Sequence, residues 1–185
     1  MFSFFKKNKN PELVKLEEPT IEPLTIDEVK RFVRITGDYE NNTIQDLIKS
    51  ARQDAERYMK SSILKQKWRL SFKYYVDNEI EMPMGPVISI DEINIIGKDG
   101  SESLFNSSFY QLSPAKYFLF FDKIPSGRFI TIDYFTGFGE TLQSVPAQIK
   151  TALLNQVAYL YENRNKVDLN PASREVFNLY RRVLI

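Results

Sequence analysis

Two stretches of the sequence decide the fold: LTIDEVKRFVRITGDYENNTIQDLIKSARQDAERYMKSSILKQ at residues 24–66, and ITIDYFTGFGETLQSVPAQIKTALLNQVAYLYENR at residues 130–164. In the first stretch, Thr25 and Glu28 have the spacing of a capping box, in which the Thr hydroxyl and the Glu carboxylate each accept a backbone amide. This spacing predicts a helix over residues 25–36.

A second helix is predicted over residues 43–63, because apolar residues recur there at intervals of three and four. These residues are Ile44, Leu47, Ile48, Ala51, Ala55, Met59 and Ile63. The other face carries charges of both signs, at Lys49, Arg52, Asp54, Glu56, Arg57 and Lys60. Such a mixture is typical of a solvated helix surface rather than of a nucleic-acid patch.

A third helix is predicted over residues 146–163, and it is apolar on more than one face. Across residues 152–161 only Asn155 and Gln156 are strongly polar. A helix of this kind is buried on several sides, so we expect a neighbouring subunit to cover part of it. The predicted interface residues are Leu154, Val157, Tyr159 and Tyr161. The alternative is a central core helix within a monomer.

Between these blocks, residues 65–135 change from helical to alternating periodicity. Trp68, Leu70 and Phe72 alternate with polar residues, and Gly97-Lys98-Asp99-Gly100 is typical of a turn between antiparallel strands. We therefore expect an α+β fold: a helical bundle of three to four helices, two N-terminal and one or two C-terminal, with an inserted small, mostly antiparallel β-sheet.

The segment Thr136-Gly137-Phe138-Gly139-Glu140 has the glycines of an anion-binding turn but not the rest of a phosphate motif. It has no Gly-Lys-Ser/Thr ending, and Glu140 stands where an anion would lie. We expect these glycines to turn the chain from the last strand into the third helix.

Residues 1–23 are predicted to form an extended N-terminal arm, because Pro11, Pro19 and Pro23 disfavour a helix. A solvated tail is the alternative. An arm that docks on a neighbouring subunit or on another protein would cover apolar side chains that are costly to expose. These docking residues are Phe2, Phe4 and Phe5.

Residues 165–185 are predicted to contain a C-terminal docking helix opened by Pro171, with apolar and basic residues interleaved. Such a helix packs either on its own domain or in the groove of a partner. The predicted docking residues, for a contact with another protein, are Val176, Phe177, Tyr180, Arg181 and Leu184.

The composition restricts the possible functions. The 185 residues suit one domain, and 25 Lys and Arg nearly balance 24 Asp and Glu, so the net charge gives no reason to bind nucleic acid. The chain has no Cys and no His, which removes two side chains that catalytic and metal sites use most. We predict no catalytic, cofactor-binding or metal-binding residues.

The N-terminus also lacks the pattern of a secretory signal, because apolar residues precede Lys6 and Lys7. No apolar run approaches the roughly 18 residues of a membrane span. We expect a soluble protein that is made in the cytoplasm and has no membrane partner.

Three groups of residues resemble the head-to-tail connector (adaptor) proteins of tailed bacteriophages and phage-like gene transfer agents. The groups are Leu24-Thr25-x-x-Glu28-Val29-Lys30 with Arg34-Ile35; Leu47-Ile48-x-x-Ala51-Arg52 with Glu56-Arg57-Tyr58 and Gln66-x-Trp68; and Tyr134-x-x-Gly137-Phe138-Gly139 with Val145-Pro146-x-x-Ile149-Lys150-x-Ala152 and Tyr161-Glu162-x-Arg164. The resemblance spans residues 24–164, which we expect to be the connector domain.

The resemblance implies a non-enzymatic subunit of a ring, commonly dodecameric, in the neck of a virion. The implied partners are further copies of the chain, the portal protein of a DNA-filled capsid, and a stopper or tail-completion protein. Double-stranded DNA would pass through the extended channel without sequence recognition. A near-neutral chain suits that channel, because a strongly basic lumen would retain the DNA.

Two other functions are compatible with the residue types. A nucleic-acid-binding module could use a basic row with aromatic neighbours, at Lys65, Lys67, Arg69, Lys73, Tyr74 and Tyr75. A carboxylate-dependent hydrolase, such as a glycosidase, needs two carboxylates facing one cleft. Candidates by type alone are Asp91-Glu92 and residues 77–81.

Overall fold

The structure is a computed structural model that describes residues 11–163 and 168–182. It divides the chain into two compact units, which the sequence pattern does not separate. The β unit comprises the described part of Met1–Glu18 together with Gln66–Thr136, and the helical unit comprises the described parts of Pro19–Lys65 and Gly137–Ile185. The prediction of an α+β fold is confirmed.

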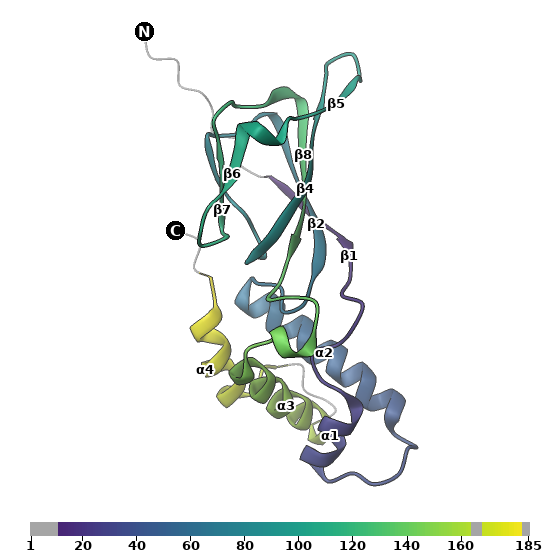
Figure 1. Ribbon diagram of the computed structural model, residues 1–185. Coiled ribbons are helices and arrows are strands. Elements are labelled where there is room, and N and C mark those ends of the chain that lie inside the picture. Colours follow the sequence, from purple (N-terminus) through teal and green to yellow (C-terminus); the bar gives the residue numbers. More distant parts are fainter. Residues whose placement is uncertain (1–10, 164–167, 183–185) are drawn as a thin grey trace. The chain divides into compact units, whose positions relative to one another are not determined.

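The β unit contains two sheets in which every strand pair is antiparallel (Figure 1). The larger sheet has the order β1-β2-β8-β4-β5 and the smaller has the order β3-β7-β6. The strands of the larger sheet are β1 Glu12–Glu17, β2 Gln66–Tyr75, β8 Ser126–Thr136, β4 Val87–Ile96 and β5 Glu102–Leu104. Those of the smaller sheet are β3 Glu79–Glu81, β7 Phe118–Phe121 and β6 Tyr110–Leu112, the last preceded by the 3-10 helix Ser107–Phe109.

The core of the β unit follows from alternation along the central strands. Leu70 of β2 lies opposite Ile132 of β8, which in turn lies opposite Ile93 of β4. All three side chains are buried, and Leu119 and Phe121 of the smaller sheet belong to the same core. The smaller sheet therefore covers apolar side chains of the larger one.

Part of the predicted N-terminal arm is an edge strand. Glu12–Glu17 pairs antiparallel with β2, and Leu13 lies opposite Leu70. The extended conformation agrees with the prediction, but the pairing was not predicted, because nothing local to residues 12–17 specifies a partner strand. Residues 1–10, with Phe2, Phe4 and Phe5, lie outside the described residues.

Four α-helices form the described helical unit: α1 Ile26–Val33, α2 Asn41–Met59, α3 Ala147–Glu162 and α4 Pro171–Tyr180. A 3-10 helix, Leu142–Ser144, precedes α3. The predicted capping box starts α1: the Thr25 hydroxyl accepts the Glu28 amide at 3.1 Å, and the Glu28 carboxylate accepts the Thr25 amide at 2.7 Å. The helix ends earlier than predicted, because Arg34 takes a left-handed conformation with φ of 59°.

We expect Thr25→Ala to lower the free energy of unfolding by about 1 kcal/mol, because the Glu28 amide loses its acceptor. Hydrogen bonds from the Thr25 amide and, to a smaller extent, from the Thr25 hydroxyl lower the pKa of Glu28 below its ordinary value, and the substitution removes only the hydroxyl bond. A depressed pKa adds stability above the ordinary pKa and loses it as acid protonates the carboxylate. Urea unfolding should therefore show a smaller stability difference between the wild type and Thr25→Ala near pH 3 than at neutral pH. Equal stabilities of the two proteins at neutral pH would contradict the role of Thr25 as a helix cap.

Helix α2 ends at Met59 rather than at the predicted residue 63. Lys60 has a left-handed φ of 54°, and its amide bonds to the Glu56 carbonyl. The amide of Ile63 then donates to the Glu56 carboxylate at 2.9 Å. Ile63 is buried as predicted, but it reaches the core from a loop.

Gly137 makes the turn out of β8, as expected. Its φ is 127°, and a Cβ atom there would lie 2.5 Å from the Leu64 carbonyl oxygen. Both conditions exclude larger residues without a backbone shift. The turn also contacts the loop that follows α2, because the Glu140 carboxylate forms an ion pair with the Lys65 ammonium group at 2.5 Å.

Candidate functional site

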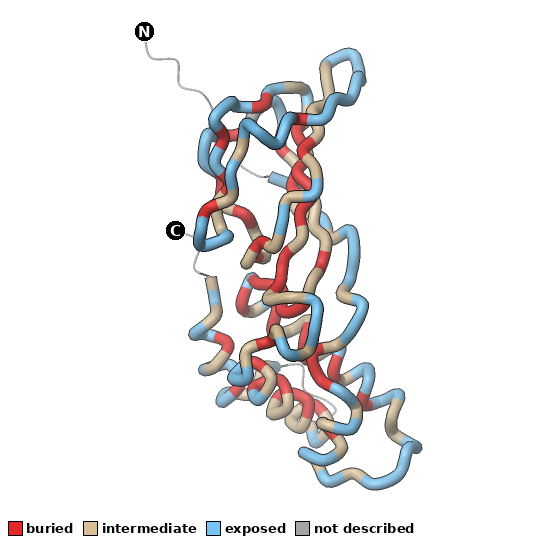
Figure 2. The backbone as a smooth tube through the Cα atoms, in the orientation of Figure 1, coloured by how far each residue is buried: buried red, intermediate tan, exposed pale blue. Residues whose placement is uncertain are grey.

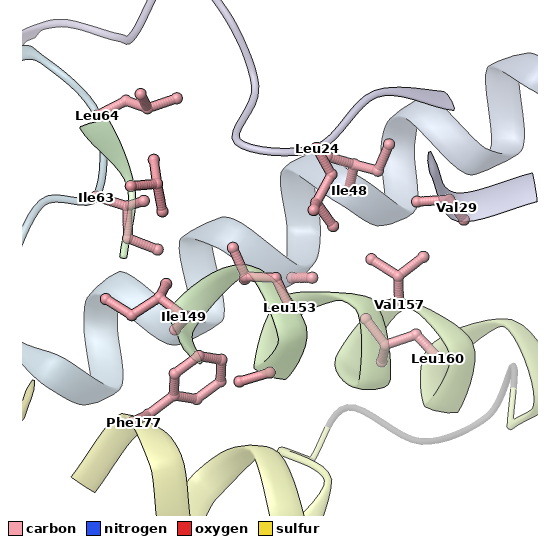
Figure 3. Close-up of a cluster of buried hydrophobic side chains, with 14 of the residues drawn as sticks. Leu24, Val29, Ile48, Ile63, Leu64, Ile149, Leu153, Val157, Leu160 and Phe177 are labelled. Carbon is pink, nitrogen blue, oxygen red and sulfur yellow. The ribbon is translucent and has the colours of Figure 1, made fainter. Parts of the chain in front are cut away.

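Helix α3 is the centre of the helical core. Helices α1, α2 and α4 all contact it. Figure 3 shows Leu153 and Val157 of α3 pointing toward Leu24 and Ile48, while Phe177 of α4 lies beside another face of α3. The apolar breadth of α3 is thus covered largely within one chain, which is the alternative of a central core helix.

In this arrangement one predicted interface residue is a core residue, and the other three have different surroundings. Val157 is fully buried in the single chain, so it has no surface for a second subunit and is a core residue. Leu154 is only partly buried and packs against the core, and the Tyr161 hydroxyl donates to the Glu40 carboxylate at 2.5 Å. The fourth residue, Tyr159, lines a groove.

The terminal helix α4 packs on its own unit. Phe177 is fully buried in the core, so its predicted role in docking is wrong for this conformation. The Ser173 hydroxyl donates to the Ala152 carbonyl at 2.8 Å, and the Tyr180 ring meets Phe138 edge-on at 6.1 Å. Val176 and Tyr180 keep partial exposure, whereas Leu184 lies outside the described residues.

A groove of about 520 Å³ opens between α2, α3 and the start of α4. Its lining includes Tyr159, Leu169 and Pro171 together with charged side chains. The described charged lining residues are Asp54, Arg57, Asp168 and Arg174. Among these groove residues only Tyr159 was a predicted site residue, because the charged face of α2 resembles an ordinary solvated surface.

Two guanidinium groups cover the Tyr58 ring at the end of this groove. The charged carbons of Arg174 and Arg181 lie 5.5 and 5.0 Å from the ring centroid. The hydrogen bond that Arg174 donates to the Tyr58 hydroxyl, at 3.4 Å, lowers the pKa of that phenol from its ordinary value. Within the described part of the chain, neither arginine has a carboxylate partner.

The basic row on β2, proposed for nucleic-acid binding, is largely neutralised. Lys67 pairs with Asp91 at 2.7 Å, and Arg69 makes a two-pronged contact with Asp133 at 2.6 and 2.8 Å. These carboxylates raise the pKa of Lys67 and of Arg69. Such pairing leaves little free positive charge for phosphates.

Two of the candidates for a hydrolase, Asp91 and Glu92, are engaged in structural contacts. Asp91 is the partner of Lys67, and the Glu92 carboxylate accepts the Asn94 amide at 2.8 Å. Over residues 11–163 and 168–182, no group of three or more His, Cys, Asp or Glu side chains could hold a metal ion. In the same ranges, no helix combines the length and apolar character needed to cross a membrane.

Residues 23–108 match the phage gp6-like head-tail connector protein family. The match confirms the resemblance carried by the first two groups of residues, and the third group, residues 134–164, lies outside the matched segment. A head-tail connector protein is a structural component and not an enzyme, as the sequence led us to expect.

Solved structures share the fold over nearly the whole chain. One is the neck of an empty gene transfer agent particle computed with C6 symmetry, with a TM-score of 0.80, 18% identity, and coverage of 94% of this chain and 97% of that chain. A chain of the native virion of a gene transfer agent matches with a TM-score of 0.79 and 18% identity, over 94% of this chain and 96% of that chain. The neck of a native gene transfer agent particle computed with C12 symmetry matches with a TM-score of 0.72 and 17% identity, over 93% of this chain and 97% of that chain. No curated protein sequence matches the chain.

Proposed function

We propose that this chain is a head-to-tail connector (adaptor) subunit that forms a ring in the neck of a phage or phage-like particle. The observation that carries the proposal is the family match over residues 23–108, combined with a fold that spans 94% of this chain and 97% of a gene transfer agent neck protein. The shared fold extends over almost the whole of both chains.

The ring would lie between the portal of a DNA-filled capsid and the stopper or tail-completion protein, and would extend the DNA channel. The C6 and C12 symmetries of the related necks are those of closed rings, and we take twelve copies as the proposed number. The helices would act as a bundle that carries subunit contacts. The neutralised row on β2 suits a channel through which double-stranded DNA slides without being held.

The purified chain should assemble into a closed ring, alone or when mixed with the portal protein of the same particle. Mass photometry or native mass spectrometry should show a species about twelve times the 21.7 kDa of the single chain. Electron micrographs of that species should show rings with a central channel. A chain that stays monomeric alone and with the portal protein would contradict the proposal.

A further inference from the structure

The loop between α1 and α2 carries an exposed aromatic ring in an acidic segment. Tyr39 is 83% exposed, the highest value among the large apolar side chains described. Gly37, with φ of 81°, lies under that ring, since a Cβ atom there would be 3.2 Å from it. Residues 36–39 of this loop are all exposed, and Figure 2 shows most of the loop as exposed. We name residues 36–40 the knob.

The sequence around the knob is negatively charged. Residues 36–46 contain Asp38, Glu40 and Asp46 and no Lys or Arg. Asp38 pairs with Lys30 at 2.7 Å, but its side chain remains 84% exposed and can accept further donors. Asp46 is exposed on the first turns of α2.

The groove described above has a lining of mixed charge, and two cations gather at its Tyr58 end. Arg174 and Arg181 hold two positive charges against one Tyr58 ring without a carboxylate partner among the described residues. Arg57 adds a guanidinium that is 78% exposed, although it also contacts Asp54 at 3.4 Å. Two neighbouring cations without a counter-charge are unfavourable in a single chain, and an acidic partner would relieve their repulsion.

We propose that the knob of one copy docks in the groove of the next copy around the ring. The Tyr39 ring would lie against Tyr159 and Pro171, and the acidic segment would face Arg174 and Arg181. The knob comes directly before the first turn of α2, and Tyr58 lies in its last turn. The 19 residues of this helix, labelled in Figure 1, separate the two by about 28 Å at a rise of 1.5 Å per residue. Two different surfaces on one rigid helix give a head-to-tail contact, the kind that closes into rings. This inference rests on the proposed ring function.

The lining of the groove carries charges of both signs, because Asp54 and Asp168 line it together with Arg57 and Arg174. The cations that the acidic segment would meet are Arg174 and Arg181, which lie together on the Tyr58 ring. A partner that brings an exposed aromatic ring and carboxylates on one short segment, as residues 36–46 do, fits this end of the groove.

The test uses two charge-reversed full-length chains. One variant reverses the two arginines beside Tyr58, Arg174→Glu/Arg181→Glu. The other reverses two charges of the acidic segment 36–46, Asp38→Lys/Asp46→Lys. Each alone should lose rings at a concentration where the wild type assembles, because every junction then joins like charges. An equimolar mixture should recover rings, since each junction of an alternating ring joins opposite charges. Mass photometry measures the ring fraction, and circular dichroism melting verifies that each variant is folded.

Matched controls separate the contact from a general charge effect. Lys98→Glu/Lys123→Glu makes the same change in net charge on the β unit and should leave the ring fraction unchanged. Tyr39→Ala should reduce it, whereas Thr43→Ala, also exposed, should not. Raising the salt concentration from about 0.05 to 0.5 M should weaken wild-type assembly, because the screening length becomes shorter.

The outcomes distinguish this contact from the ring itself. Rings in the wild type and in both single reversals would overturn the knob-and-groove contact and leave the proposed ring function intact. Reversals that lose rings but do not complement each other would also overturn the pairing. Wild-type rings that form only when double-stranded DNA is added, and that Arg174→Glu abolishes, would assign the groove to phosphate instead. A wild type that never assembles would overturn both proposals.

Discussion

Phe177→Ala is expected to lower the free energy of unfolding of the helical unit by about 3 to 5 kcal/mol, which is the usual cost of truncating a buried phenylalanine. The Phe177 side chain is fully buried in the same core as Ile149 and Val157. Its removal leaves a cavity between α3 and α4, and α4 loses its main apolar contact. Urea unfolding followed by helical circular dichroism measures the loss.

Leu179→Ala is the matched control, because Leu179 lies on the same helix and is 76% exposed. It should change the stability by less than about 0.5 kcal/mol. Deleting residues 176–185 should destabilise the chain at least as much as Phe177→Ala. A truncated chain with a normal melting temperature would instead support the prediction that this segment docks on another protein.

The local elements were predictable because their signals are local. The spacing of Thr25 and Glu28 places the start of α1, and the Gly97–Gly100 turn joins β4 to β5. The end of α2 was not predictable, because Ile63 continues the helical spacing of apolar residues although the helix has already ended before Lys60. The pattern records only that Ile63 is buried, which a loop residue can be as well.

The partners of apolar faces could not be predicted from the pattern. Val157 and Phe177 were assigned to contacts with other chains, and both are core residues of this one. An apolar helix face has the same sequence whether its own domain or a partner covers it. The groove was missed for a related reason: Arg174 and Arg181 come together with Tyr58 only after α4 has packed against α2.

The charged face predicted for α2 also hides a buried ion network. The Arg52 guanidinium donates to Glu22 at 2.7 and 3.1 Å and to Glu56 at 3.0 Å. The Arg52 side chain is 1% exposed and that of Glu56 is 4% exposed, so for these two residues the prediction of a solvated surface is wrong. Helical spacing does not distinguish them from Lys49, which is exposed on the same helix.

Arg52→Met should therefore cost about 3 to 5 kcal/mol of unfolding free energy, because it leaves buried carboxylates without their cation. The matched control Lys49→Met should cost less than about 0.5 kcal/mol. Replacing the whole network, with Glu22→Gln and Glu56→Gln added to Arg52→Met, should recover part of the loss, since no buried charge is then left unpaired. Urea unfolding of the three variants measures these differences. Equal stabilities for Arg52→Met and Lys49→Met would mean that water reaches the network in solution and that Arg52 does not fix the segment before α1 to α2.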